Sequence, residues 1–175
     1  MKKLLLITVF CLTIAFAFGQ SKRFVSLYGK MQLNSTQRDI IKHSNPWSIG
    51  FGVEALFNTG NKCKPLIDIT KDAYLLSDKV LYTRNGVEIP RIDEMNNILA
   101  GLSYQPIPEM YISFVSGASF INDQVLLAVK PSMGFSFTEN RRWVVKVSYI
   151  NVFDRDKVTK QDFGSVSFSL AIRVF

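Results

Sequence analysis

Residues 47–55 alternate strictly in character, and this period of two is the feature that most limits the possible folds of the chain. Every odd position in the stretch is apolar, and every even position is small or charged. Successive side chains of a β-strand point to opposite faces, so such a strand has one face in an apolar setting and one in a polar setting. The pattern therefore favours an all-β fold built from two-faced strands.

The same alternation recurs along the chain and predicts eight strands of roughly ten residues, the length that a tilted membrane strand needs. The alternating stretches lie at 25–33, 47–55, 67–70, 98–104, 110–119, 125–135, 143–149 and 166–174. Beyond residue 19 no apolar run is long enough for a membrane-spanning helix. We expect an antiparallel up-and-down transmembrane β-barrel. A soluble periplasmic β-protein, such as a sandwich or a lipocalin-like barrel, also alternates and stays open as an alternative.

The N-terminus has the three-part pattern of a secretory signal. Two lysines precede an apolar stretch that ends at Phe18, and Ala17 and Gly19 place small residues where a signal peptidase reads them. The apolar stretch has about 15 residues, fewer than the roughly 20 of a spanning helix. We predict a cleaved signal peptide over 1–19 and a single barrel domain over 20–175.

The lengths of the connections favour a membrane barrel over a soluble one. If the mature chain starts in the periplasm, the periplasmic connections are short and rich in turn formers, at 58–61, 105–108 and 138–141. The outer connections at about 34–45, 76–95 and 154–163 are longer and polar, and only the one near 122–123 is short. Short turns on one side and long loops on the other are typical of transmembrane barrels.

The longest connection contains its own turn signal. Asn85 and Gly86 both tolerate positive φ and favour a two-residue hairpin turn. A turn there makes Ile67 face Tyr104 and keeps apolar residues opposite apolar ones. We predict that 76–95 forms a tall hairpin that projects beyond the membrane; a disordered loop is the alternative.

Aromatic residues gather near the predicted strand ends. Five fall at the periplasmic ends and three near the outer ends: Phe57, Tyr104, Phe135, Phe137 and Trp143, then Trp47, Tyr149 and Phe168. Two aromatic belts are expected at the two interfaces of a membrane. The alternative interpretation is the ordinary aromatic core of a soluble sandwich.

The C-terminal strand, 165–175, alternates and ends in an aromatic residue. In this strand and in its whole pattern, the chain resembles the small eight-stranded outer-membrane β-barrels of Gram-negative bacteria. The resemblance implies contact with outer-membrane lipid and lipopolysaccharide. It also implies recognition by the barrel-assembly machinery through Phe168, Leu170, Ile172, Val174 and Phe175. Phe175 departs from the family pattern, because it is in phase with Arg173 and not with the apolar residues. Either the last residue bends out of register or Val174 is the true lipid-facing end.

In such a barrel the polar face lines the lumen. It collects four cations and three anions, namely Lys30, Glu54, Asp68, Asp72, Lys130, Lys146 and Arg173. An eight-stranded barrel is just wide enough to be filled by side chains, so charges inside it have to pair or be solvated. We predict a structural plug of ion pairs, with a narrow polar conduit as the alternative.

Catalysis is not expected, and a barrel-embedded lipid hydrolase that uses a His–Ser pair is the enzymatic alternative. The one histidine, His43, is followed by Ser44, but neighbouring strand residues point to opposite faces. The sequence has no phosphate loop, zinc-ligand spacing or paired-carboxylate motif, so we expect no enzyme, metal or cofactor. The net charge of +7 comes from scattered basic residues, and export argues against a nucleic-acid partner. We predict a structural or surface-interaction barrel; a narrow porin or small-solute barrel is the alternative.

Overall fold

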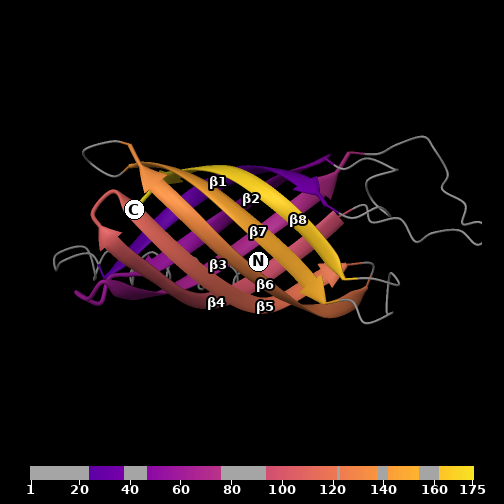
Figure 1. The fold of residues 1–175 in the computed structure, drawn as a ribbon, viewed down its shortest axis with the longest axis horizontal. Coiled ribbons are helices and arrows are strands. Elements are labelled where there is room, and N and C mark those ends of the chain that lie inside the picture. Colours follow the sequence, from indigo (N-terminus) through magenta and orange to yellow (C-terminus); the bar gives the residue numbers. More distant parts are fainter. Residues whose placement is uncertain (1–23, 38–46, 76–93, 122, 138–141, 154–161) are drawn as a thin grey trace, which may run out of the picture.

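A computed structural model describes residues 24–37, 47–75, 94–121, 123–137, 142–153 and 162–175. They form eight strands: β1 (Val25–Thr36), β2 (Trp47–Phe57), β3 (Cys63–Tyr74), β4 (Glu94–Ile107), β5 (Met110–Ile121), β6 (Gln124–Ser136), β7 (Trp143–Phe153) and β8 (Phe163–Arg173). Each strand pairs antiparallel with its neighbours in sequence, and β8 closes onto β1 (Figure 1). The predicted eight-stranded up-and-down barrel is confirmed. Within the described ranges there is no long apolar helix of the kind that crosses a bilayer.

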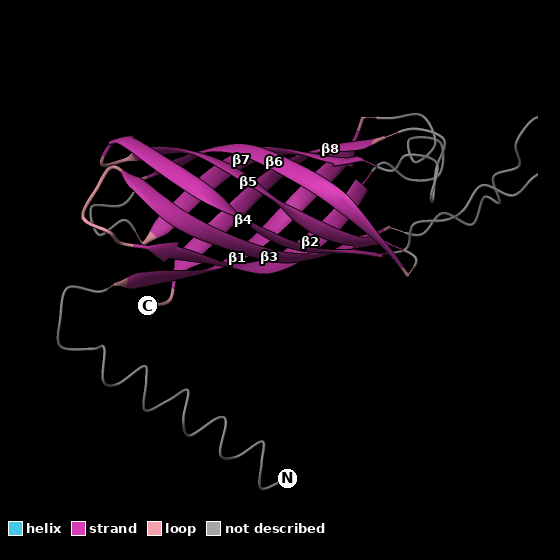
Figure 2. Cartoon of the chain, turned by 90° about the horizontal axis from the view of Figure 1, so that it is seen from below, coloured by secondary structure: helices cyan, strands magenta, loops and turns pink. Residues whose placement is uncertain are grey.

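The two ends of the barrel differ in which chain segments meet there. β1 begins and β8 ends at the same end (Figure 2), which is called the inner end from here on; the opposite end is the outer end. The inner end carries the connections β2–β3, β4–β5 and β6–β7, and the outer end carries the other four. Most of the predicted loops at about 34–45, 76–95 and 154–163, the turn at 138–141 and the signal peptide lie outside the described residues. Each loop is shorter than predicted, because β1 runs to Thr36, β4 begins at Glu94 and β8 begins at Phe163.

The outer wall is apolar and the interior is largely polar. Phe51 is 63% exposed on the wall, whereas Glu54, from the opposite phase of the same strand, is buried. The same contrast holds around the barrel, where large apolar side chains such as Met31, Ile98 and Leu127 are half exposed. Soluble proteins rarely expose apolar patches of this extent, so the arrangement is the reverse of theirs. The period of two in the sequence therefore separates an apolar outside from a polar inside, as expected.

Two glycines allow β4 and β5 to approach closely. A Cβ on Gly101 would collide with the carbonyl oxygen of Phe114, and a Cβ on Gly117 would collide with that of Ile98. Both glycines belong to the inward-facing phase of their strands. They therefore relieve crowding where the small barrel is strongly curved, one of the roles that glycine has in strands.

The register of β3 against β4 differs from the prediction. Ile67 lies opposite Ala100, and Tyr104 lies opposite Cys63, a shift of four residues from the expected pairing. An even shift leaves every side chain on its own face, so the alternation of the sequence cannot detect it. The described pairing extends to Ala73 and Glu94. The predicted turn at 85–86 lies outside the described residues.

The outer wall becomes polar at the outer end of β3 and β4. Lys71 and Glu94 point outward and form an exposed salt bridge, with 2.6 Å between Nζ and Oε2. A hydrogen bond and the positive charge of Lys71 lower the pKa of the Glu94 carboxyl. The apolar wall on this side therefore ends near Ile69 and Ile98, and both strands continue beyond it.

The second inner connection is shorter than predicted. β4 continues through Ile107, with an irregularity in its pairing to β5 between Tyr104 and Ile107. Only Pro108 and Glu109 join the two strands, so the turn is not 105–108. A β-bulge absorbs residues that the sequence pattern assigns to a loop.

The C-terminus ends in a bulge against β1. The backbone N–H groups of Val174 and Phe175 both donate to the carbonyl oxygen of Leu27, at 2.8 and 3.4 Å, and the Leu27 N–H donates to the Phe175 oxygen at 3.0 Å. Two residues thus oppose one, the pattern of a β-bulge. Val174 and Phe175 are both exposed. The last residue therefore leaves the alternating register, and Val174 is the more exposed of the two, so both possibilities left by the sequence fit the structure.

Candidate functional site in the barrel lumen

The predicted lumen charges come from six of the eight strands. Lys30 on β1, Glu54 on β2, Asp68 and Asp72 on β3, Lys130 on β6 and Lys146 on β7 are all buried. Each occupies an inward-facing position of its strand. Arg173, at the end of β8, is only partly buried and lies at the inner end.

Five of these residues meet across the middle of the lumen, and they are called the central ion-pair layer. Asp68 accepts hydrogen bonds from Lys30 and, at 3.0 Å, from Lys130. Glu54 accepts one from Lys146, and its Oε2 lies 3.8 Å from the Nζ of Lys30. These side chains are at most 7% exposed. Three ammonium groups therefore share two carboxylates away from solvent.

Asp72 is not part of this layer and is held by neutral amides. Its Oδ1 accepts hydrogen bonds from Gln32 at 2.5 Å and Asn34 at 2.8 Å, and its Oδ2 accepts one from Asn97 at 3.1 Å. These three amides were not predicted from the sequence, although their place in the inward-facing phase could have identified them. With Asp72 included, the six buried charges balance as three positive and three negative.

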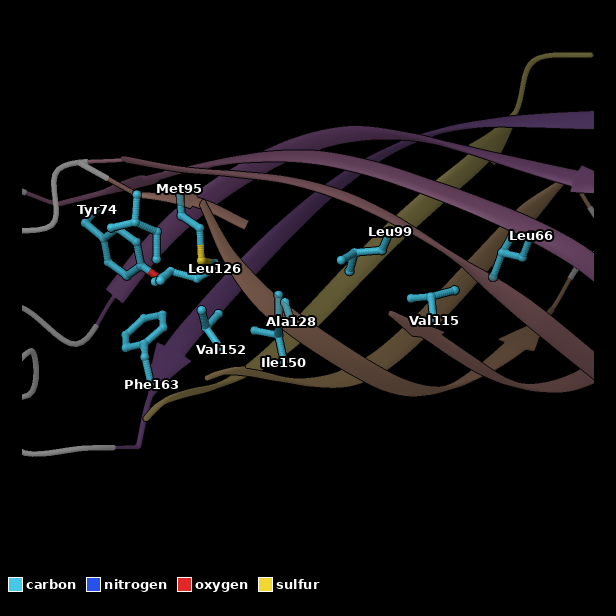
Figure 3. Close-up of a cluster of buried hydrophobic side chains, with 11 residues drawn as sticks. Leu66, Tyr74, Met95, Leu99, Val115, Leu126, Ala128, Ile150, Val152 and Phe163 are labelled. Carbon is cyan, nitrogen blue, oxygen red and sulfur yellow. The ribbon is translucent and has the colours of Figure 1, made fainter. Parts of the chain in front are cut away.

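An apolar cluster fills the outer end of the lumen and was not predicted. It is called the outer apolar plug and comprises Tyr74, Met95, Ile121, Leu126, Val152 and Phe163, all buried. Figure 3 shows most of these side chains gathered at one end of the barrel, and the rings of Tyr74 and Phe163 meet edge to face at 6.0 Å. The expectation of a polar face throughout the lumen is wrong here. Burial of apolar side chains in a barrel this narrow excludes water and stabilises the fold.

The inner end of the lumen holds a cavity of about 190 Å³, called the inner vestibule. Side chains from all eight strands line it, among them Tyr28, Lys64, Ser136 and Arg173. Glu54 of the central ion-pair layer also lines it, as does Tyr111, and the Nζ of Lys146 lies 5.4 Å from the centre of the Tyr111 ring. Tyr111 was missed by the sequence analysis. Its ring occupies space left by Gly134, because a Cβ on that glycine would collide with it.

The predicted interface aromatics all lie on the outer wall, but not all at the predicted height. Six of the eight rings are exposed or partly exposed and lie at or close to strand ends: Trp47, Phe57, Tyr104, Phe135, Phe137 and Trp143. Phe168 instead lies halfway along β8, opposite Leu33 and Val147. Tyr149 lies nearer the outer end of β7, and its hydroxyl end covers Gly164, the second residue of β8 at the outer end. Phe168 is therefore not near the outer end as predicted, whereas Tyr149 is.

The described part of the lumen offers hydrogen bonding and charge pairing but no group of metal ligands. Among the described residues, no three His, Cys, Asp or Glu side chains gather closely enough to hold a metal ion. His43 and Ser44 lie outside the described residues. Cys63 is exposed at the start of β3.

No family model matches the chain, and no curated protein matches it in sequence. Its fold is similar to that of Ail, the attachment invasion locus protein of Yersinia pestis. The crystal structure of Ail gives a TM-score of 0.53 at 12% identity over 85% of this chain and 97% of that one. Ail in a phospholipid nanodisc gives 0.55 at 13% identity, over 85% and 98% of the two chains. A designed transmembrane β-barrel gives 0.51 at 8% identity, over 85% and 95%. At these identities the likeness concerns the fold, and by its fold the chain is an eight-stranded β-barrel of the outer-membrane type.

Proposed function

We propose that the protein is an integral outer-membrane barrel with a closed lumen, and that it has a structural role or presents a surface to partners. The observation that carries this proposal is the filled interior. The outer apolar plug and the central ion-pair layer lie one behind the other, so a solute or ion would have to pass two barriers of different chemistry. Ions cross a hydrophobic constriction poorly, and the buried charges are already paired.

The apolar outer wall favours a position of the barrel within a lipid bilayer. Apolar side chains cover it, while the polar pair of Lys71 and Glu94 lies at the outer end, where the wall leaves the bilayer. In this proposal the inner end faces the periplasm, residues 1–19 direct export, and the surroundings are lipid and lipopolysaccharide. The exposed C-terminal Val174 and Phe175 are available to the barrel-assembly machinery. Ail is named as an attachment protein, and a surface role here would be of the same general kind.

The alternative of a narrow porin rests on the inner vestibule, which opens the lumen at one end. For conduction, the central ion-pair layer and the outer apolar plug would both have to open. No catalytic arrangement in the described residues favours an enzyme.

Planar-bilayer recordings test the closed lumen. We expect the folded mature protein to give no steady current, with folding checked by a gel shift on boiling. Phe163→Ser, which opens only the outer apolar plug, should also stay closed because the central ion-pair layer remains. Reproducible open-channel current from the parent protein would refute the proposal. Carbonate extraction that released the folded protein from membranes would instead favour a soluble periplasmic protein.

A further inference from the structure

We propose that the inner vestibule is a binding site for a small organic anion, one with a carboxylate or similar group on a short apolar or aromatic body. This inference goes beyond the closed-barrel role. It rests on the shape of the vestibule, the charge of its walls and a buried hydroxyl group that has no partner among the described residues.

The vestibule is a cavity in the inner end of the lumen, with the wall of the barrel around it. Its volume of about 190 Å³ equals that of roughly six water molecules. Residues of every strand form its wall together with Asn58 and Pro108 of two inner connections, so the barrel sets most of its shape. On its inward side it reaches Glu54 of the central ion-pair layer and Tyr111. A ligand would enter from the inner end.

The charged groups on the wall favour an anion. Lys64 on β3 and Arg173 on β8 both line the vestibule, and Lys64 donates a hydrogen bond to the neutral amide of Gln105 at 3.0 Å. Glu54 is the only carboxylate among the described lining residues, and it is already held by Lys146. The described lining residues therefore carry two positive charges and one negative charge, and a concave low-dielectric wall strengthens the attraction of an anion.

Ser136 supplies a hydrogen-bond donor that none of the described residues uses. Its side chain lines the vestibule and is only 6% exposed, and its Oγ has no hydrogen-bond partner in the described structure. Buried hydroxyl groups nearly always have a partner, so an unused one at a cavity wall indicates a place for a polar ligand atom. The hydroxyl can donate to an oxygen of the anion while Lys64 and Arg173 provide the charge.

The rest of the wall suits an apolar body. Leu56, Pro108 and Val144 line the vestibule together with the rings of Tyr28 and Tyr111. Binding pockets for small molecules commonly combine such apolar walls with a few polar groups that fix the orientation of the ligand. Benzoate has the required charge, ring and size, and benzamide is its neutral counterpart of nearly the same shape.

Titration of the folded protein in detergent micelles with benzoate and with benzamide, followed by NMR chemical shifts, tests the inference. We expect benzoate to bind about tenfold more tightly, since a charge-assisted hydrogen bond is roughly twice as strong as a neutral one. Shifts should concentrate at vestibule residues such as Tyr111 and Val144. Absent binding, or equal affinity for the two probes, would overturn the proposal without any variant having to fold.

Matched variants separate the vestibule from its surroundings. Lys64→Gln and Arg173→Gln should each weaken benzoate binding several-fold and leave benzamide unaffected. Lys62→Gln removes the same charge two residues away, does not line the vestibule, and should have no effect. An equal loss in Lys62→Gln would reduce the effect to general surface charge and contradict a defined site.

The hydroxyl group has its own control. Ser136→Ala should lower benzoate affinity several-fold. Ser148→Ala removes another buried hydroxyl without a partner, outside the vestibule, and should leave affinity unchanged. If both variants bind as the parent does, Ser136 is not a ligand contact and the proposed geometry is wrong. Because the titration does not need a closed lumen, a current in planar bilayers would refute the proposed function and leave this result standing.

Discussion

Asp68→Asn tests most directly whether the central ion-pair layer is desolvated. The substitution keeps the shape of the side chain and removes the charge that Lys30 and Lys130 share. Both lysine side chains are at most 2% exposed, so they cannot reach water without a rearrangement. The layer then contains three cations and one carboxylate, where the parent has three cations and two carboxylates. Removal of one partner of a buried pair costs about 3–5 kcal/mol, and we expect the free energy of unfolding to fall by that amount.

A charge-balanced variant separates the loss of charge from the loss of shape. Asp68→Leu combined with Lys130→Met leaves Lys30, Lys146 and Glu54, and so keeps the excess of one positive charge. Replacement of a buried ion pair by apolar residues of similar volume is often neutral or stabilising. We therefore expect the double variant to be more stable than Asp68→Asn by about 1 kcal/mol or more.

Urea-induced unfolding from lipid vesicles measures both effects. Trp47 and Trp143 lie exposed on the outer wall and report by fluorescence on their transfer from lipid to water. The m-value, which is the slope of the unfolding free energy against urea concentration, should be the same in the variants and the parent. A shift of the unfolding midpoint then reports a change in stability alone. If Asp68→Asn unfolds within about 1 kcal/mol of the parent, the two lysines are solvated. The reasoning for a closed lumen would then be wrong.

Two further substitutions test the wall of the barrel. Val53→Arg places a charge on the lipid-facing wall and should destabilise the barrel in vesicles by roughly 2–4 kcal/mol. The control Lys71→Arg, at the polar outer end, should have little effect. Equal stability of Val53→Arg and the parent would reverse the assignment of inside and outside. Gly101→Ala should lower the free energy of unfolding by about 1–3 kcal/mol in the same urea assay, because its Cβ would collide with the backbone of β5. Gly29→Ala is the control, because the nearest neighbour of its Cβ would be 3.7 Å away. Similar stabilities for both variants would show that β4 and β5 are not in close contact.

The strands and their faces could be predicted from the sequence because the period of two is a local property. Side chains alternate along any strand, so the inward phase of Lys30, Glu54 and Lys146 follows from their apolar neighbours alone. The same rule could have placed Tyr111 and Asn97 inside the barrel. The number of strands and the short inner turns together indicated closure into an up-and-down barrel.

The partners inside the lumen could not be predicted, because they depend on how the strands are staggered. Lys146 reaches Glu54 across 92 positions of sequence, and the four-residue error between β3 and β4 left the alternation intact. The stagger and tilt that close eight strands set which inward residues share a level.

Only the tertiary structure decided at which level of the lumen the polar and the apolar inward-facing residues lie. Met95, Leu126 and Phe163 have the same inward phase as the buried charges, yet they lie at the outer end and pack against one another. The bulge at Phe175 depends likewise on a backbone partner, Leu27, at the other end of the chain. The sequence by itself determined the two faces of each strand, since alternation needs only the geometry of a single strand. The levels along the lumen, and with them the plug, the ion pairs and the vestibule, were decided only when all eight strands closed.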